Sequence, residues 1–517
     1  MSATPAPLPP LEPGARRLAT VALSLATFMN VLDTTIANVS LPNIAGDLGV
    51  SPTQGTWVIT SFGVANAIAV PLTGWLSQRV GQVRLFVASV VLFVIASLLC
   101  GLAGSLEMLI AARVLQGAVA GPMIPLSQAL LLQAYPRDKS GMALAMWSMT
   151  TLVAPVMGPI LGGWLSDNLS WPWIFYINVP VGIGAAWMSW QLLKHRETPT
   201  RQLPIDKVGL ALLVIWVGAL QILLDKGKEL DWFESGEIIA LAVVTVVGFA
   251  LFVAWELTEE HPVVDLTLFA RPNFLFGVIA LATAYGVFFG NVVVLPLWLQ
   301  QYMGYTATWA GIVTAPIGIL ALVLSPVIGK ILPRTDPRRL ATVAFLVFAL
   351  VSFMRSGLST DIAPGSIVIP QLIQGIAMAC FFIPLVSITL SGLPMERVPS
   401  ASGVSNFVRI TCGAFGASLM TTLWERRAAL HHEQLAAQVS AYNPVASDTL
   451  SQLQAQGFDL ARGLGVLERQ VSVQAFSLAA NDVFWMSGCL FLLLLVSVWL
   501  THPTHGRPAA GGGDAAH

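Results

Sequence analysis

The chain has 517 residues, of which 55% are hydrophobic and only 10% are Asp, Glu, Lys or Arg. Soluble domains carry roughly 25% charged residues and need polar side chains to cover their surfaces. This composition, with a mean hydropathy of +0.74, excludes a soluble enzyme, a disordered protein and a coiled coil. The net charge of −1 gives no support to nucleic-acid binding, which requires a basic face.

Membrane-spanning helices need about 20 mainly apolar residues each. The sequence contains fourteen such runs, so we expect an all-α integral membrane protein with 14 transmembrane helices. The runs cover residues 18–38, 53–76, 83–103, 106–131, 140–164, 173–193, 207–224, 237–256, 273–298, 307–331, 340–356, 365–390, 400–423 and 483–500. Residues 1–17 are expected to be a cytoplasmic disordered leader, and residues 501–517 a cytoplasmic flexible tail.

The basic residues predict the orientation of the chain. With both termini in the cytoplasm, 17 of the 26 Lys and Arg residues lie on cytoplasmic segments. Three lie on short external loops, namely Lys226, Lys228 and Arg355. Because Lys and Arg concentrate on the cytoplasmic side of membrane proteins, this ratio favours termini inside the cell.

A weak internal repeat divides the chain. The first and second halves share three matched patterns: Gly74, Arg79 and Arg84 with Gly329, Arg334 and Arg339; Leu115-Gln116-Gly117 with Ile373-Gln374-Gly375; and Thr56-Trp57 with Thr308-Trp309. We therefore expect two six-helix bundles, at 18–200 and 261–500, separated by a two-helix insert at 201–260. Two related bundles around a central site are typical of secondary transporters.

The segment 424–482 is the only sizeable polar stretch inside the second bundle. Leu430, Leu435, Leu464 and Leu467 recur in it at helical spacing among polar residues, which predicts a periplasmic loop with two amphipathic helices. These helices pack either on the rim of the same protein or on a partner protein.

Asp33 is the candidate for proton coupling. It lies about 15 residues into the first run, or roughly 22 Å along a helix, which places it well inside the bilayer. A charged Asp at the bilayer centre costs about 2.5–3.5 kcal/mol on insertion scales. Asp33 is therefore either a carboxylate that binds and releases protons or a structural residue bonded to a neighbouring helix. Asn30, three residues earlier on the same face, can share its hydrogen bonds.

Two arginines also lie within apolar runs. Arg113 needs an internal partner because its guanidinium does not lose its proton, and it has either a role in transport or a pure packing role. Arg409, with Asn406 three residues before it, occupies the thirteenth run. Arg409 either offers a positive charge to an anionic substrate or has a structural role.

Polar and aromatic residues at helical spacing are candidates for a substrate cavity, since such sites are mainly apolar with a few polar groups. Each is otherwise an ordinary packing residue. The candidates are Asn30, Asn38, Gln116, Trp147, Tyr285, Phe289, Asn291, Gln374, Phe381, Phe382, Asn406 and Arg409.

Energy sources and cofactors are limited by what the sequence lacks. The four cysteines form no CxxC pair, so we expect no zinc or redox site. No Walker A motif is present, which disfavours ATP hydrolysis and leaves an ion gradient as the energy source. We therefore expect no cofactor and transport driven by the proton gradient.

Several motifs resemble those of the major facilitator superfamily, in its fourteen-helix drug:proton antiporter group. They are residues 32–42, 74–81, 113–117 and 158–163. Residues 113–117 resemble a motif that is linked to proton transfer in this family, so the resemblance assigns Arg113, with Asp33, to proton coupling. The resemblance implies a secondary active transporter, not an enzyme, with gating residues Gly74, Arg79, Gly81, Arg84, Pro155, Gly158, Pro159, Gly162 and Gly163. Ser77 stands where this family usually has Asp, so Arg79 is expected to use a helix end or another carboxylate.

Segments 54–67 and 225–233 and the loop before the last run look like the inner-membrane pumps of Gram-negative tripartite exporters. That likeness implies multidrug efflux and antibiotic resistance by alternating access, with hydrophobic, often weakly acidic toxic compounds as substrates. It also implies an EmrA-type periplasmic adaptor (a membrane fusion protein) and a TolC-type outer-membrane channel as partners. An uptake permease for a small nutrient and a non-transporting membrane sensor or scaffold are the alternatives.

Overall fold

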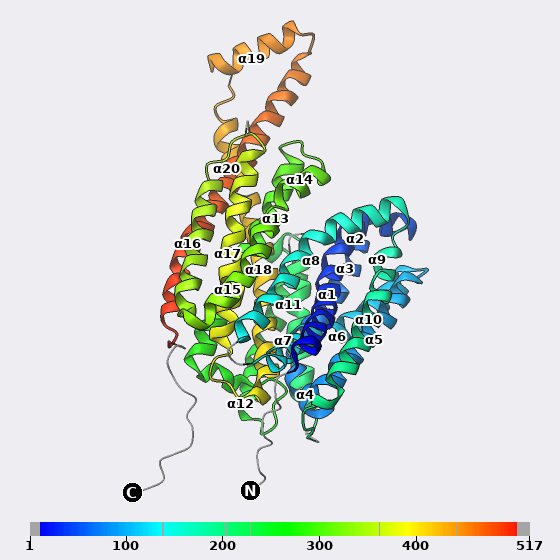
Figure 1. Cartoon of the computed structure of the whole chain (residues 1–517). Coiled ribbons are helices and arrows are strands. Elements are labelled where there is room, and N and C mark those ends of the chain that lie inside the picture. Colours follow the sequence, from blue (N-terminus) through cyan, green and yellow to red (C-terminus); the bar gives the residue numbers. More distant parts are fainter. Residues whose placement is uncertain are drawn as a thin grey trace.

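The computed structural model of the chain (Figure 1) describes residues 11–136, 139–201, 204–227, 229–360, 362–440 and 442–503. The regular structure of these residues is helical and contains no strand. All fourteen predicted runs fold as helices, so the predicted all-α architecture is confirmed. Most of the expected leader, most of the expected tail, Arg137 and Lys228 lie outside the described residues.

The first six runs form α1 (Pro13–Asp47), α2 (Pro52–Gly55), α3 (Trp57–Ala69), α4 (Thr73–Val80), α5 (Gln82–Gly101), α6 (Leu106–Ala120), α7 (Met123–Ala134), α8 (Ser140–Asn168), α9 (Trp173–Tyr176) and α10 (Asn178–Leu193). The insert forms α11 (Lys207–Lys226) and α12 (Gly236–Thr258). The last six form α13 (Pro272–Gln301), α14 (Ala307–Thr314), α15 (Ile317–Ile331), α16 (Pro337–Arg355), α17 (Gly365–Thr389), α18 (Val398–Ala436) and α20 (Leu460–Trp499), with α19 (Pro444–Ala455) between the last two. Short 3-10 helices are η2 (Lys194–Arg196), η3 (Trp232–Glu234), η4 (Leu266–Ala270), η5 (Leu332–Arg334) and η6 (Met395–Arg397).

Three predicted spans are broken where a proline follows the first helical segment. Pro71 separates α3 from α4, which are bent by 62°. Pro122 separates α6 from α7, and Pro316 separates α14 from α15. Proline has no N–H to donate and its ring clashes with the preceding turn, so it breaks or kinks a helix.

By length and hydropathy alone, ten segments of the described chain can cross a membrane, or eleven if the bent pair α3–α4 counts as one span. The other three predicted spans are α8, α10 and α18, which are helical but are not among those segments. Of these segments α12 is the least covered by protein, since only 17% of its most apolar stretch is buried. Apolar side chains with no protein neighbours suit the hydrocarbon core of a bilayer.

The two halves repeat the same helix packing. In the first half α1 packs on α8 and α10, α5 packs on α6 and α10, and α3 packs on α6. In the second half α13 packs on α18 and α20, α16 packs on α17 and α20, and α15 packs on α17. The insert helices α11 and α12 pack on each other, and α11 also contacts α3 and α18. Two six-helix bundles plus a two-helix insert are therefore observed.

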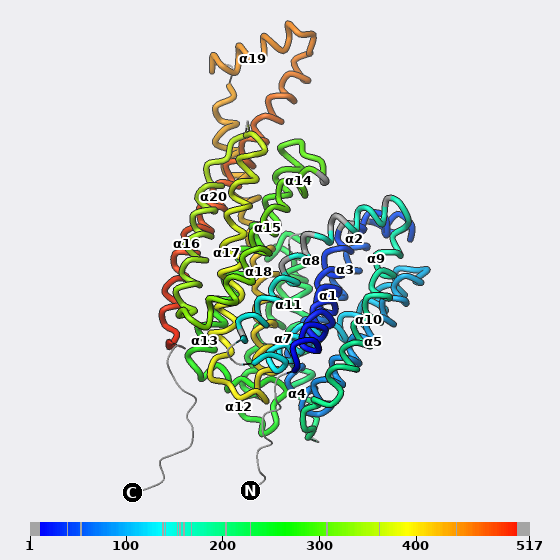
Figure 2. Tube along the Cα trace, viewed as in Figure 1, coloured from blue at the N-terminus to red at the C-terminus, as the bar shows by residue number. Residues whose placement is uncertain are grey.

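The segment 424–482 differs from the prediction. Its amphipathic stretches are not separate helices but continuations of α18, which ends at Ala436, and of α20, which begins at Leu460. No proline interrupts residues 400–436 or 460–499, so nothing ends these helices at the expected bilayer edge. With α19 they form a helical projection beyond the bundle (Figures 1 and 2).

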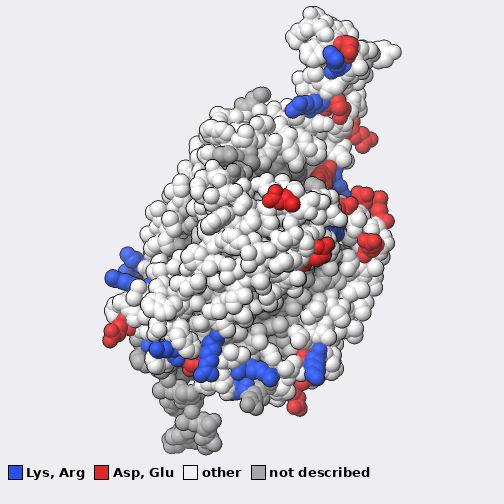
Figure 3. All heavy atoms as spheres, turned by 90° about the vertical axis from the view of Figure 1, so that its right-hand side faces the viewer, with Lys and Arg blue, Asp and Glu red and all other residues white. Residues whose placement is uncertain are grey.

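The two ends of the molecule differ in charge. α1 begins and α20 ends at the end opposite the projection, here termed the terminal end (Figure 1). The projection marks the far end. Figure 3 shows Lys and Arg side chains gathered toward the terminal end on the face in view.

Candidate functional site

Asp33 of α1 and Arg113 of α6 form an ion pair inside the first half. Arg113 Nη1 lies 2.6 Å from Asp33 Oδ2, and the two residues are 1% and 0% exposed. The Arg113 Nε also donates to the backbone oxygen of Val58, at 3.0 Å. Because α1 and α6 are far apart in sequence, this buried pair ties together two helices of the bundle.

Two polar side chains complete the coordination of Asp33, and Ser97 holds both of them. Its Oδ1 accepts hydrogen bonds from Gln116 Nε2 and Asn178 Nδ2, both at 3.0 Å. Gln116 also donates to Ser97 Oγ at 2.8 Å and accepts from Arg113 at 2.6 Å. Sequence reasoning did not select Ser97 or Asn178, although a lone Asn within an apolar run is a signal that could have identified Asn178.

The network lies among aromatic rings and away from solvent. The Arg113 guanidinium lies 4.2 Å from the centroid of the Phe62 ring and 5.6 Å from that of Phe175. A buried ion pair in such surroundings is sensitive to the loss of either charge, which costs about 3–5 kcal/mol. Loss of either charge would therefore leave the other one buried without its counter-ion.

Asn30 does not join this network. Its Nδ2 donates to the backbone oxygen of Ala120 at 3.0 Å, so the expected sharing of hydrogen bonds with Asp33 is wrong. Asn30 and Asp33 are almost a turn apart, and the side chain of Asn30 instead reaches the C-terminal end of α6. Asn38, further along α1, is exposed.

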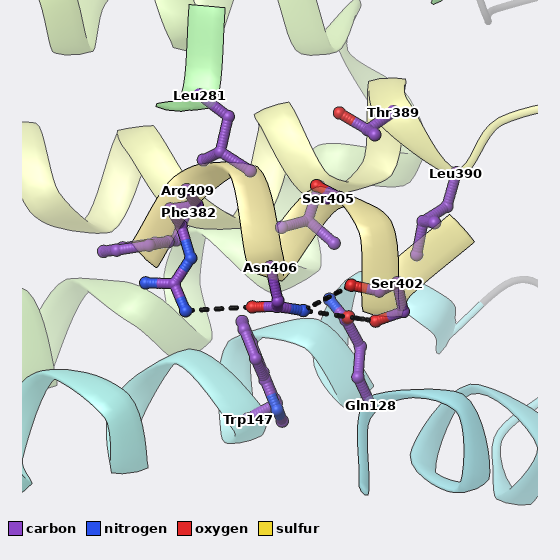
Figure 4. Close-up of a pocket in the computed structure, with 11 residues that line it drawn as sticks. Gln128, Trp147, Leu281, Phe382, Thr389, Leu390, Ser402, Ser405, Asn406 and Arg409 are labelled. Carbon is purple, nitrogen blue, oxygen red and sulfur yellow. Dashed lines mark hydrogen bonds between the residues drawn. The ribbon is translucent and has the colours of Figure 1, made fainter. Parts of the chain in front are cut away.

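A second polar site lies between the two halves (Figure 4). This inter-half cavity has a volume of about 10 Å³, enough for roughly one water molecule. It is lined by Gln128, Trp147, Leu281, Phe382, Val386, Thr389, Leu390, Ser402, Ser405, Asn406 and Arg409. Four of these residues (Trp147, Phe382, Asn406 and Arg409) were selected from the sequence, whereas Gln128, Ser402 and Ser405 were not.

Arg409 supplies the positive charge of the cavity. Its Nη2 donates to Asn406 Oδ1 at 2.9 Å, and the residue is 6% exposed. The guanidinium lies 4.7 Å from the ring centroid of Tyr285 and 5.6 Å from that of Phe382. None of the ion pairs found in the described ranges includes Arg409.

Ser402 and Gln128 hydrogen-bond to each other and thus join the two halves at the base of the cavity. Asn406 donates to the backbone oxygen of Ser402 at 2.8 Å, so its amide is held between Ser402 and Arg409 (Figure 4). These polar groups could not be grouped from sequence because they come from α7 and α18, which are 274 positions apart at this bond.

The remaining aromatic and amide candidates lie within the second half. Phe289 stacks on Tyr285, with ring centroids 5.7 Å apart, and so supports the ring that faces Arg409. Phe381 packs on Phe348 inside the bundle. Asn291 accepts a hydrogen bond from Ser487 at 3.1 Å. These last contacts are inside the bundle and not in the cavity.

The predicted position of Arg355 on a short external loop is wrong. Arg355 is the last residue of α16 and is 3% exposed. Its Nη2 donates to Gln374 Oε1. The apolar run ends next to Arg355, so sequence alone could not show that its side chain turns back into the bundle.

Glycines close the terminal end of the interface between the halves. A Cβ on Gly74 of α4 would lie 2.6 Å from the Cβ of Ser400 on α18. A Cβ on Gly141 of α8 would lie 2.6 Å from the carbonyl oxygen of Gly329 on α15. Real Cβ contacts are not this short, so the two halves approach closely here only because these positions lack side chains. The structure is therefore closed at its terminal end.

Comparison with known proteins identifies the family. Residues 23–417 match the model of the Major Facilitator Superfamily. The chain belongs to this superfamily. It is 53% identical over 509 residues to "Multidrug export protein EmrB" of Escherichia coli strain K12, covering 98% of this chain and 99% of that protein. It is 49% identical over 505 residues to "Fatty acid resistance protein FarB" of Neisseria gonorrhoeae, covering 98% and 99%.

Solved structures agree with the superfamily fold. The human organic anion transporter MFSD10 (TETRAN) superimposes with a TM-score of 0.59 at 13% identity, covering 94% of this chain and 100% of that one. A bacterial homologue of the human lysosomal transporter Spinster, solved inward-facing and unoccupied, gives 0.53 at 17% identity, covering 95% and 98%. The chain is thus a multi-pass membrane transporter of the major facilitator superfamily and not an enzyme.

A carboxylate from a later segment lies at the C-terminal end of the superfamily motif at residues 74–81. Glu197, in the segment after α10, accepts hydrogen bonds from the backbone N–H groups of Val83 and Arg84 at 3.0 and 2.8 Å. It therefore caps the N-terminus of α5, where negative charge is favoured. Gly81 has φ +97°, and a Cβ there would lie 2.5 Å from the Glu197 carboxyl carbon. Arg79 lies over the Trp75 ring, 5.4 Å from its centroid.

The superfamily motif on α8 faces α1. Gly158 packs against Thr35, and a Cβ on Gly162 would lie 2.8 Å from Ile36 Cγ1. α8 therefore packs closely against α1, the helix that carries Asp33, as small residues allow in membranes. Gly163 follows on the same helix. The side chains of Pro155 and Pro159 lie outside the described part of the chain.

Proposed function

We propose that this transporter is a drug:proton antiporter that exports hydrophobic, often weakly acidic toxic compounds by alternating access. The relatives that it matches over nearly their full lengths are named for multidrug export and fatty acid resistance. The observation that carries the coupling mechanism is the buried Asp33–Arg113 pair, with its 2.6 Å contact.

Proton binding and substrate binding use different sites in this proposal. Asp33 lies within the first half, whereas Arg409 lies in the cavity between the halves. Protonation of Asp33 frees Arg113 and changes the packing of α1, which α8 contacts through Gly158 and Gly162. Because α8 also meets α15 at the terminal end, a change at Asp33 is transmitted to the interface between the halves. The proton gradient thus supplies the energy, with no cofactor.

We infer the orientation and the partners from the two ends of the molecule. The basic terminal end faces the cytoplasm under the positive-inside rule, so both chain termini lie there and the α18–α20 projection extends into the periplasm from the inner membrane. We assign this projection to an EmrA-type adaptor, which would connect the transporter to a TolC-type outer-membrane channel. A groove between α18 and α20, lined by Val439, Leu464, Leu467 and Val471 among others, supports this assignment.

Replacement of Asp33 by Asn tests the coupling role. The variant keeps the size of the side chain but cannot alternate between charge states, so we expect proton-driven export to be abolished in proteoliposomes with a pH gradient. Asp47→Asn, at the exposed end of the same helix, is the matched control and should transport normally. Full transport by Asp33→Asn contradicts the proposal.

Loss of folding is separated from loss of coupling by a second variant. Asp33→Asn leaves Arg113 unpaired at a cost of about 3–5 kcal/mol, so its thermal unfolding should be measured beside transport. The double variant Asp33→Asn with Arg113→Gln removes both charges and should recover much of the stability. A double variant that is stable and still transports against a gradient also overturns the assignment.

A further inference from the structure

The two-helix insert contains a buried carboxyl group with an unused oxygen. Glu256, in the last turn of α12, is 3% exposed. Its Oε2 accepts a hydrogen bond from the backbone N–H of Val264 at 3.1 Å. Its Oε1 is buried and has no hydrogen-bond partner among the described residues. A buried charged oxygen without a partner is costly, so a ligand or a proton is required there.

A second carboxylate faces the same point. Asp206 caps α11 by accepting from the N–H of Gly209 at 2.8 Å, and it also accepts from Trp255 Nε1 at 3.0 Å. A Cβ on Gly209 would lie 2.6 Å from Glu256 Oε1 and closer still to Asp206 Oδ2. The two carboxyl oxygens therefore approach each other across a glycine that leaves room for both.

The charged groups around this pair do not neutralise it. Lys207 follows Asp206 but is exposed, as are Glu260 and His261 on the segment after α12. Glu259, next to them, adds further negative charge. No ion pair found in the described part of the chain includes Asp206 or Glu256.

We propose that Glu256 and Asp206 form a second proton-binding site, outside the Asp33 network, in which one proton is shared between the two carboxyl groups. Two carboxylates at one buried site cannot both be charged without strong repulsion. The protonated Glu256 donates its O–H to Asp206, which satisfies the unused Oε1 and holds the end of α12 against the start of α11. Loss of the proton separates these two helix ends.

The site is connected to the interface between the halves through a short series of contacts. Glu256 holds the N–H of Val264, and the next residue, Asp265, forms an ion pair with Arg397. Arg397 immediately precedes α18, and Ser400 in the first turn of α18 meets Gly74. We therefore expect proton occupancy of the insert to stabilise the closed terminal end, and proton loss on that side to weaken it.

Hydrogen exchange on the full-length transporter in nanodiscs tests the site. Exchange of residues 259–271 and 398–403 is measured across pH for the wild type and for Glu256→Gln, which mimics the protonated acid. Comparison at equal pH removes the intrinsic base catalysis of exchange. The wild-type to variant ratio should be near one at low pH and rise by about tenfold per pH unit once the shared proton is lost.

Two controls make the result specific. Glu237→Gln removes an exposed carboxylate from the first turn of the same helix and should behave as the wild type. Asp33→Asn should retain the pH response, so failure of the coupling proposal and failure of this one are distinguishable. A constant ratio across pH overturns the proton site. A response confined to residues 259–271, without residues 398–403, overturns its link to the closed end.

Discussion

Arg113 and Arg409 are both buried arginines, but their surroundings differ. Arg113 has the Asp33 carboxylate at 2.6 Å, whereas Arg409 is held by the Asn406 amide and the Tyr285 and Phe382 rings. A buried cation without a counter-ion is unfavourable until an anion reaches it. We therefore propose that Arg409 binds the acidic part of an amphipathic substrate and that the aromatic rings contact its apolar part.

Replacement of Arg409 by Gln should separate acidic from neutral substrates. A hydrogen bond to a charged group contributes about 1.5–3 kcal/mol, so we expect affinity for a hydrophobic carboxylic acid to fall by about tenfold or more. Binding of a neutral compound of similar size should change little. The measurement is binding to the purified transporter, with Arg426→Gln, an exposed site on the same helix, as the control. Equal losses for both substrate types would assign Arg409 a structural role.

At the residue scale, the sequence predicted how deeply a charged residue lies better than it predicted which residues that charge contacts. The apolar runs around Asp33 and Arg113 predicted that both residues lie inside the membrane, and in the structure they are 0% and 1% exposed. Which residues meet is decided by helix rotation and by α10, whose Asn178 reaches Asp33 from 145 positions away. Arg355 shows the opposite error, because a charge at the end of an apolar run can turn either outward or inward.

At the element scale, the crossing of α8 and α15 depends on two glycines. Gly329→Leu should prevent this approach, because its Cβ alone would lie 2.8 Å from the carbonyl oxygen of Gly141. Overpacking of this kind typically costs about 1–3 kcal/mol, which should shift the population away from the state closed at the terminal end. A cysteine replacing Ser405, which lines the cavity, should then react several-fold faster with a water-soluble maleimide added on that side.

The matched control is Gly184→Leu on α10, where an added Cβ meets nothing within 4 Å. Both variants are made in a background without the native cysteines. Unchanged reactivity in Gly329→Leu would mean that this crossing does not close the terminal end. Helix positions were well predicted because hydropathy reports burial in lipid, but such crossings were not, since close approach depends on glycines from segments far apart in sequence.

At the scale of the whole molecule, the internal repeat correctly predicted two bundles with matching packing, because repeated sequences conserve the faces that helices bury. It could not predict features that break the symmetry. The insert has no counterpart, and the α18–α20 projection interrupts only the second half. The hydropathy pattern limited these two runs to residues 400–423 and 483–500, whereas α18 continues to Ala436 and α20 begins at Leu460.

The projection offers a groove of about 420 Å³ that lies outside the bundle, lined by Val439, Leu464, Leu467 and Val471 among others. Leu464→Glu adds a second negative charge to this largely apolar groove, beside Glu468. A central apolar anchor commonly contributes about 2 kcal/mol or more to a protein interface. We expect adaptor binding to weaken by about tenfold or more, measured by co-purification at graded concentrations. Transport by the isolated protein should be unchanged, because the groove is remote from Asp33 and Arg409. Leu460→Glu, exposed at the start of α20 and outside the groove, should bind normally, whereas undiminished binding by Leu464→Glu would place the adaptor on another surface.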